Sequence, residues 1–267
     1  MAIFHSHFFS NVLGFQTEAE VILPQPASDL QVGVETTEKR STWPCLWLLH
    51  GLSDDHTAWI RRSSIERYAE AAGCAVVMPN VHRSFYTDMT HGGDYWTFIS
   101  EELPSLMRSF FPLSNRREDN AVAGLSMGGY GAARWLLSKP DHFIAGASLS
   151  GSLNLPKRIQ EVKQQEPDRL LARSIELAFG DRDLNGGPED LNWLLEQFKP
   201  DDLKPPLLQI CGSEDFLYED NLTFKKIAED MRYPLTYRER TGSHEWGFWD
   251  EAIQEVLAWL PKQGFGR

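Results

Sequence analysis

The sequence predicts an α/β protein with a mostly parallel central sheet of about eight strands, helices on both faces and a small cap insertion. Short apolar runs alternate with segments of helical period along most of the chain, which favours parallel strands joined by right-handed crossovers. The 267 residues, 42% of them hydrophobic, suffice for one large domain with a sizeable core. A serine between two glycines lies at a strand-to-helix junction near mid-chain.

The first half opens with two segments of partly alternating polarity, 3–13 and 16–23, which we expect to form an antiparallel pair. A continuous apolar run at 45–49 is typical of a central strand that is buried on both faces. The elements predicted after it are a helix over 57–72, a strand over 74–78 and a helix over 98–111. The polar and aromatic stretch 80–95 follows a strand, where ligands bind in open α/β sheets.

The second half continues the alternation. One strand is predicted to end at 121–123, and three more cover 143–149, 207–212 and 235–239. Helices are predicted over 130–137, 218–231 and 247–260. Between them, residues 152–206 are rich in charge, with a short strand expected over 175–179 and a helix over 190–198. This segment is too poor in apolar residues to build its own core. We therefore interpret it as a cap-like insertion within a single domain, 1–267.

The stretch 120–133 organises the chain. It carries the pattern G-x-S-x-G at Gly124, Ser126 and Gly128, between a buried strand and an Ala-rich helix, which is the signature of a nucleophile elbow. A turn this tight places the serine in strained backbone space, and side chains in place of the two glycines would collide with the neighbouring strand and helix. The N–H groups at the start of the helix favour a developing anion. Ser126 is therefore the predicted nucleophile.

A nucleophilic serine needs a base and an acid. In the α/β-hydrolase fold the nucleophile, the acid and the histidine follow one another in chain order. Asp215 follows the strand at 207–212 and His244 follows the last strand, so Ser126, Asp215 and His244 meet this order. Histidine can take the serine proton and return it to the leaving group, while the carboxylate fixes the imidazole tautomer.

Two backbone N–H groups are predicted to form an oxyanion hole. Met127 follows the nucleophile, and Leu52 lies in a loop that opens with His50-Gly51, where this fold places its second donor. We interpret His50 as a residue that orients this loop rather than as the base. The sequence leaves alternatives open, namely Asp181 or Asp183 for the acid, with Asp220 and Asp250 also considered, and His82, His91 or His142 for the base.

Composition argues against several classes of function. A net charge of -12 makes a nucleic-acid or anionic-membrane partner unexpected. No segment approaches the ~20 apolar residues of a membrane span, and the N-terminus has no signal-peptide pattern.

Cys45, Cys74 and Cys211 lie in apolar runs, as expected of reduced core cysteines in a cytoplasmic protein. His5 and His7 share a strand face without a third ligand, so no metal site is expected. A homo-oligomer stays an open alternative.

Several further motifs resemble the esterase D family, which includes S-formylglutathione hydrolases, feruloyl and acetylxylan esterases and mycobacterial mycolyltransferases. The matching segments lie at 50–52, at Trp59 with the arginines at 61 and 62, and at 101–104, 124–129, 212–216 and 242–246. The segments 86–89 and 95–100 are most similar to bacterial tributyrin esterases. The resemblance spans nearly the whole chain and is weakest over 155–204. It implies a triad of Ser126, Asp215 and His244, short-chain acyl esters as substrates, and no cofactor.

We therefore expect a serine carboxylesterase that hydrolyses short-chain acyl esters through an acyl-enzyme intermediate. S-formylglutathione hydrolases usually have histidine before the elbow serine, where this chain has Leu125, and this departure disfavours the glutathione thioester. The alternatives are an S-formylglutathione thioesterase, a sugar O-acetyl esterase and an acyltransferase to an acceptor other than water. A non-catalytic binding protein on a hydrolase scaffold is the alternative from a different class.

Overall fold

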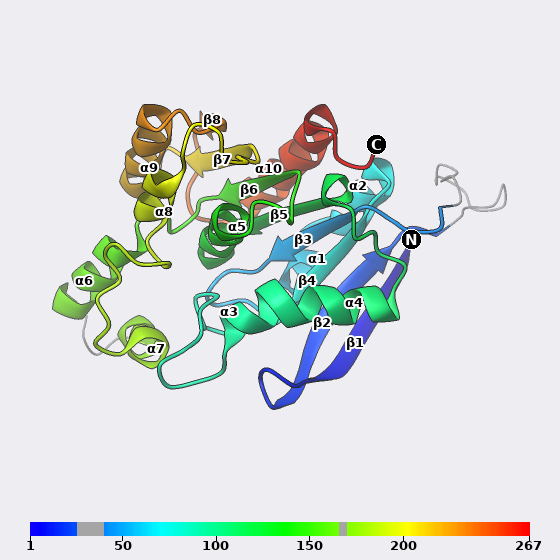
Figure 1. Ribbon diagram of the computed structural model, residues 1–267, viewed down its shortest axis with the longest axis horizontal. Helices are drawn as coiled ribbons and strands as arrows, with labels where there is room; N and C mark the ends of the chain where they lie inside the picture. The colour runs from blue at the N-terminus through cyan, green and yellow to red at the C-terminus, as the bar shows by residue number, and fades with distance from the viewer. Residues whose placement is uncertain (26–39, 166–169) are drawn as a thin grey trace.

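The structure is a computed structural model that describes residues 1–25, 40–165 and 170–267. Its centre is an eight-stranded sheet with the order β1-β2-β4-β3-β5-β6-β7-β8 (Figure 1). The strands are β1 (Ala2–Ser10), β2 (Phe15–Leu23), β3 (Cys45–Leu49), β4 (Ala75–Pro79), β5 (Asn120–Leu125), β6 (Ala145–Leu149), β7 (Leu207–Gly212) and β8 (Leu235–Arg240).

Strand direction follows the sequence pattern. β1 pairs antiparallel with β2, and β2 pairs antiparallel with β4. All other neighbours in the sheet are parallel. The predicted opening antiparallel pair and the mostly parallel sheet are therefore confirmed. β3 and β5 are adjacent in the middle of the sheet, so the loops that follow them lie side by side at its carboxyl edge.

Helices cover both faces of the sheet (Figure 1). Side chains from α4 (Leu103–Phe110), α5 (Met127–Ser138) and α9 (Tyr218–Asp230) join one hydrophobic core, and those from α1 (Ala58–Arg62), α2 (Ile65–Ala72) and α10 (Trp246–Trp259) join the other. In β3, Trp47 and Leu49 face the first core while Leu46 and Leu48 face the second. Successive side chains of a strand point to opposite faces of the sheet, so a strand that is buried on both faces is apolar throughout.

Two predicted helices differ in detail. The helix expected over 57–72 is broken between α1 and α2, where Ser63 has extended backbone and its hydroxyl donates to the Trp59 carbonyl over 2.6 Å. A serine hydroxyl that bonds its own backbone competes with helical hydrogen bonds. The helix expected over 98–111 begins earlier, with α3 (Tyr95–Thr97), and passes through a π-helical turn (Phe98–Glu102) into α4. A short 3₁₀ turn at Arg117–Asp119 precedes β5, and another at Leu260–Gln263 follows α10.

The segment between β6 and β7 holds α6 (Leu155–Gln165), α7 (Leu170–Phe179) and α8 (Leu191–Gln197). The strand predicted over 175–179 is wrong, because these residues form the end of α7. The buried residues Ala172, Ile175, Ala178 and Phe179 follow helical spacing, which a five-residue window conceals. The helix predicted over 190–198 is confirmed, and the Asp190 carboxylate caps it by accepting from the N–H groups of Asn192 and Trp193.

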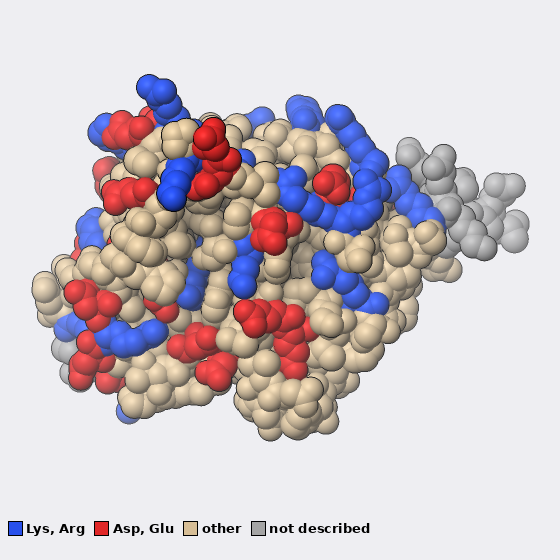
Figure 2. All heavy atoms as spheres, viewed as in Figure 1, with Lys and Arg blue, Asp and Glu red and all other residues tan. Residues whose placement is uncertain are grey.

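Basic and acidic side chains are interspersed on the face shown in Figure 2. Within the described residues, none of the helices is both long enough and apolar enough to cross a bilayer. The three cysteines are buried and free, as their apolar surroundings predict.

Candidate active site

Ser126 lies at the turn between β5 and α5. Its backbone has φ 54° and ψ -118°, a region that residues with a side chain rarely adopt. Its N–H donates to the Leu149 carbonyl of β6 over 2.8 Å, and its own carbonyl accepts from Tyr130 of α5 over 3.0 Å. Bonds to the flanking strand and helix thus hold the serine in this strained conformation.

The two glycines of the motif allow close backbone contact around the turn. A Cβ atom on Gly124 would lie 2.3 Å from the Gly128 carbonyl oxygen. A Cβ atom on Gly128 would lie 2.4 Å from the carbonyl oxygen of Leu49, at the end of β3. Both distances are well inside van der Waals contact, so the tight packing of β3, β5 and α5 requires glycine at both positions.

The structure brings Ser126, His244 and Asp215 together from three separate loops. His244 Nε2 lies 2.9 Å from Ser126 Oγ, and His244 Nδ1 lies 2.8 Å from Asp215 Oδ2. A carboxylate only accepts hydrogen bonds, so Nδ1–H donates to Asp215 and Nε2 is left to accept the serine proton. The serine hydroxyl therefore faces the ring nitrogen that a general base uses.

Asp215 is buried, with 5% of its surface exposed. Burial raises the pKa of this carboxyl group, but hydrogen bonds from His244 and from the Leu217 N–H outweigh burial and leave the pKa below its usual value. Asp215 is therefore ionised at neutral pH and can stabilise an imidazolium at His244.

Two aromatic rings pack on the imidazole. Phe216 lies 4.6 Å from it between ring centroids, and Trp249 of α10 meets it nearly at a right angle at 4.8 Å. Trp249 is buried, whereas 64% of the Phe216 surface is exposed. Trp249 fixes the ring from the protein side, and Phe216 shields it from the solvent side.

The two predicted oxyanion donors lie beside Ser126. Leu52 and Met127 both line a cavity with the serine. Within the described part of the chain, no group accepts a hydrogen bond from the N–H of either residue. Both N–H groups are therefore free to bind a substrate oxygen.

His50 is buried below this loop and contacts neither Ser126 nor Asp215 through a hydrogen bond. Its Nε2 accepts from the Val81 N–H over 3.1 Å, so its Nδ1 carries the proton and donates to the Gly51 carbonyl over 2.7 Å. The Asp54 N–H donates to the same carbonyl over 3.2 Å. Burial lowers the pKa of His50 to about 4, so the ring is neutral at physiological pH. The geometry supports the interpretation of His50 as a loop-orienting residue.

Two hollows meet at Ser126. A small apolar cavity of about 80 Å³ is bounded by Phe85, Met127 and residues of α6 and α7, including Ile159 and Ile175. A larger groove of about 520 Å³ contains polar and aromatic side chains, among them Arg83, His244 and Trp246. Leu52, Ser126 and Phe216 line both hollows. The serine thus lies between a small apolar cavity and a larger groove that has more polar side chains in its lining.

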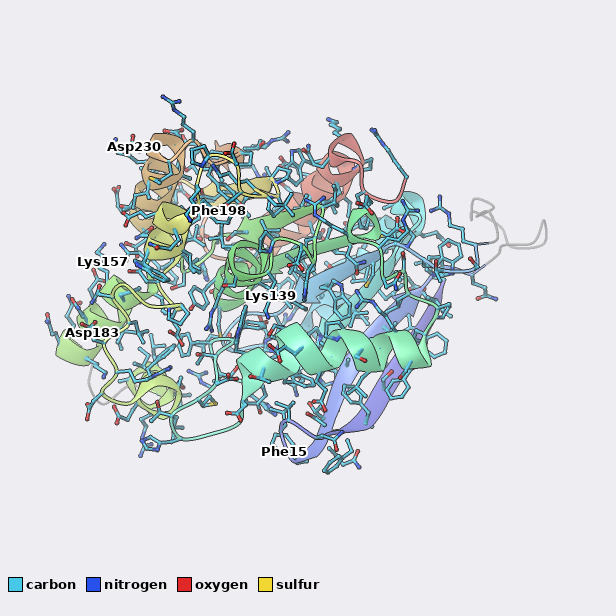
Figure 3. The ribbon with its side chains drawn as sticks, in the orientation of Figure 1. Phe15, Lys139, Lys157, Asp183, Phe198 and Asp230 are labelled. Carbon is cyan, nitrogen blue, oxygen red and sulfur yellow. The ribbon has the colours of Figure 1, made fainter. Side chains whose placement is uncertain are left out.

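The alternative acids lie elsewhere. Asp181 and Asp183 are exposed, and Asp183 lies at the periphery of the molecule beside the inserted helices, where it accepts from Asn185 (Figure 3). Asp220 pairs with Lys157 over 2.7 Å. Asp250 accepts from the Tyr68 hydroxyl. None of these four carboxylates is hydrogen-bonded to a histidine in the described residues.

The alternative bases are also separate from the serine. His82 packs against Tyr95, His142 packs against Phe143, and His91 is exposed. None of the three shares either hollow with Ser126. The structure therefore assembles only one complete set of serine, histidine and carboxylate among the described residues.

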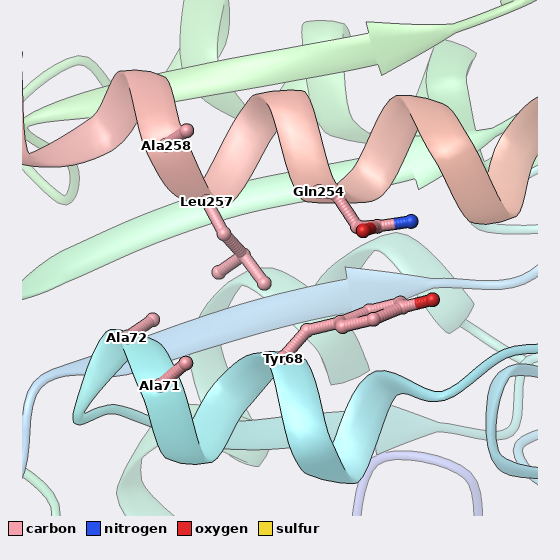
Figure 4. A pocket seen from close by; sticks show the side chains of 6 residues that line it. All are labelled: Tyr68, Ala71, Ala72, Gln254, Leu257 and Ala258. Atoms are coloured by element: carbon pink, nitrogen blue, oxygen red, sulfur yellow. The ribbon is translucent and has the colours of Figure 1, made fainter.

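Another surface hollow, of about 280 Å³, lies between α2 and α10 (Figure 4). Among the described residues it is lined by alanines and Leu257, and by the polar side chains of Tyr68 and Gln254. It contains no nucleophile and no base, so it has no part in the chemistry at Ser126.

Some residues of the site were not singled out from the sequence. Phe216 lies in the matched segment 212–216 and Arg83 in the polar stretch 80–95, but neither residue was assigned a role of its own. Ile159 and Ile175 come from the inserted segment, whose pattern is weakest. The periodicity of α7 was the one signal that could have identified Ile175, since it marks a buried helical face.

Comparison with known proteins agrees with this geometry. A family model described as "Putative esterase" matches residues 10–260. The chain belongs to this esterase family. Among the curated relatives, an acetyl esterase from Caldicellulosiruptor saccharolyticus is 30% identical, with 98% of this chain and 99% of the relative covered.

Two solved structures from Staphylococcus aureus have the same fold as this esterase. The fluorophosphonate-binding serine hydrolase FphF is 35% identical with a TM-score of 0.85, over 97% of this chain and 98% of that one. The S-formylglutathione hydrolase FrmB is 34% identical with a TM-score of 0.81, over the same shares of the two chains. The esterase is accordingly an enzyme of the serine hydrolase class with an α/β-hydrolase fold.

Proposed function

We propose that this esterase hydrolyses short-chain acyl esters, with Ser126 as nucleophile, His244 as general base and acid, and Asp215 as the orienting carboxylate. The observation that supports it best is the continuous hydrogen-bonded chain from Ser126 Oγ through the imidazole to Asp215, with spacings of 2.9 and 2.8 Å. A serine hydroxyl is a poor nucleophile at neutral pH, and such a chain is what activates it.

The first half of the reaction forms an acyl-enzyme. Ser126 Oγ attacks the acyl carbon while its proton moves to His244 Nε2, and the carbonyl oxygen becomes an oxyanion. The N–H groups of Leu52 and Met127 stabilise this charge, and one such donor is worth about 10² to 10³ in rate. The imidazolium then gives its proton to the alcohol oxygen as the carbon–oxygen bond breaks.

The second half regenerates the enzyme. A water molecule gives a proton to His244 and attacks the acyl carbon through a second tetrahedral intermediate. The proton then returns to Ser126 Oγ as the carboxylic acid leaves. The same histidine thus acts as base and as acid in both halves, and Asp215 keeps it in one tautomer throughout.

The small cavity supports a short acyl group. It is apolar, measures about 80 Å³ and is lined on one side by the inserted helices α6 and α7. An acetyl or butyryl chain meets little steric resistance there, whereas a long chain needs the helices to move. We therefore propose that residues 152–206 act as a cap that limits the length of the acyl chain and favours short-chain esters such as tributyrin.

Two relatives favour particular substrates. The acetyl esterase from C. saccharolyticus supports acetyl esters, including O-acetyl groups on sugars. The S-formylglutathione hydrolase from S. aureus supports a formyl thioester as the second candidate. Leu125, which precedes the nucleophile, is buried and lines the polar groove. The ratio of kcat/KM for an acetyl ester to that for S-formylglutathione decides between the two.

Replacement of the nucleophile tests the proposal. Ser126→Ala should abolish p-nitrophenyl acetate hydrolysis and labelling by a fluorophosphonate probe, with an unchanged circular dichroism spectrum. Ser109→Ala is the matched control, because this serine is exposed on α4 and lines neither hollow at Ser126. Residual turnover by a folded Ser126→Ala variant above about a thousandth of the wild-type rate would contradict the assignment.

A further inference from the structure

The polar groove beside Ser126 contains one arginine. Arg83 lies in the loop after β4, is partly buried and lines the groove together with Ser126, His244 and Trp246. It does not line the small apolar cavity on the other side of the serine. With the acyl group in the small cavity, as proposed above, a guanidinium at this position faces the part of the substrate that leaves as the alcohol.

Arg83 is anchored through only one of its nitrogens. Its Nε donates to the Ser174 hydroxyl of α7 over 2.7 Å. In the parts of the chain that the structure describes, no carboxylate lies within ion-pair distance of Arg83, and neither terminal nitrogen has an acceptor. Partial burial lowers the pKa of the guanidinium, which reflects a charge that the protein does not compensate. The two terminal nitrogens are therefore free to bind an anion.

The groove also contains two carboxylates, those of Asp54 and Glu245. Glu245 caps α10 by accepting from the N–H groups of Gly247 and Phe248 over 2.8 and 2.9 Å. Asp54 is partly buried, and burial raises the pKa of its carboxyl group. Neither carboxylate forms an ion pair with Arg83. Among the charged side chains of the groove in the described residues, Arg83 is therefore the one with unused hydrogen-bond donors.

The small cavity does not offer an equivalent site. Arg158, which lines it, pairs with Glu161 over 3.5 Å and lies over the Phe216 ring at 5.5 Å. Its charge is compensated by a carboxylate of its own helix. An anionic group on the acyl portion thus meets an apolar wall and an occupied arginine, whereas one on the alcohol portion meets Arg83.

We propose that Arg83 binds an anionic oxygen group, a carboxylate or a phosphate, on the alcohol portion of the ester. This rests on the proposed esterase function and specifies the class of alcohol that it releases. The planar guanidinium presents two parallel N–H groups, which match the oxygens of a carboxylate or phosphate, while Nε keeps it positioned through Ser174. Arg83 is thus a specificity-determining residue of the alcohol site.

The test uses a pair of acetate esters that differ in one charge, 4-acetoxybenzoate and methyl 4-acetoxybenzoate. The measured quantity is the ratio of kcat/KM for the anionic ester to that for the neutral ester. Arg83→Gln should lower this ratio at least about tenfold, equivalent to about 1.4 kcal/mol, mainly by raising KM for the anionic ester. Arg67→Gln removes the same net charge at an exposed position outside the groove, and its ratio should match that of the wild type.

Arg83→Lys provides a second variant in case Arg83→Gln does not fold. It keeps the charge but loses the paired donors, so its ratio should fall severalfold rather than tenfold. Equal ratios in the wild type and the Arg83 variants, or an equal drop in Arg67→Gln, would overturn the role of Arg83. Failure of the wild type to hydrolyse either ester would instead refute the esterase function on which the proposal depends.

Discussion

Replacement of His50 by alanine tests how the oxyanion loop is held. The ring donates to the Gly51 carbonyl over 2.7 Å, and this carbonyl belongs to the same planar peptide group as the Leu52 N–H. Fixing the carbonyl therefore fixes the direction of the N–H on the opposite side of the peptide. Acceptance of hydrogen bonds by the carbonyl also polarises the peptide and makes its N–H a stronger donor.

The expected loss follows from the remaining contacts. Complete loss of one oxyanion donor costs about 10² to 10³ in kcat. In the alanine variant the Asp54 N–H still donates to the Gly51 carbonyl over 3.2 Å, so the peptide keeps part of its orientation. We therefore expect kcat to fall by about 10- to 100-fold with little change in KM, because the oxyanion exists in the transition state. Loss of an acceptor for the buried Val81 N–H should also cost about 1–3 kcal/mol of folding stability.

The assay is steady-state hydrolysis of p-nitrophenyl acetate, with thermal unfolding measured in parallel. His91→Ala is the matched control, because this histidine is exposed and lines neither hollow at Ser126. His50→Gln, which can offer both a donor and an acceptor, should recover part of the loss. A folded His50→Ala enzyme with kcat within twofold of the wild type would refute the orienting role, and a loss as large as that of Ser126→Ala would show that His50 acts chemically.

Four further results are expected. The free energy of unfolding of the wild type should fall as pH drops from about 6.5 toward about 4. In this range the unfolded chain binds a proton at His50, whereas the folded chain, in which the pKa of His50 is lowered to about 4, does not. Denaturant titrations of His50→Ala should lack this part of the pH dependence. Asp215→Asn should lower kcat about 10⁴-fold. Because the pKa of Asp215 is lower in the folded protein than in the unfolded chain, its ionised carboxylate stabilises the fold above the unfolded pKa. The difference in melting temperature between the wild type and Asp215→Asn should therefore shrink below about pH 4. Leu171→Ala should enlarge the small cavity and raise kcat/KM for p-nitrophenyl octanoate relative to acetate, and an unchanged ratio would exclude this cavity as the acyl site.

Local patterns carried most of the fold prediction. β3 and β7 have the bounds that the sequence indicates, because strands buried on both faces are almost continuously apolar; the one polar residue of β7, Gln209, donates hydrogen bonds to Asn221. The elbow is equally local, since Gly124 and Gly128 mark a turn that a side chain would block. The inserted segment was harder: α7 carries a short apolar stretch over 175–179 in which strand and helix look alike.

The sequence by itself determined the chain order of strands and helices outside the inserted segment, the elbow at Ser126 and the chain order of the three polar residues, because local patterns mark each of them. Only the tertiary structure decided which groups meet: His244 reaches Ser126 across 118 positions of the chain, and His50 reaches the Val81 N–H across 31. The groove beside Arg83 is likewise decided only by folding, because its walls come from five separate stretches of the chain. Periodicity records which face of an element is buried, but it carries no information about which partner covers that face.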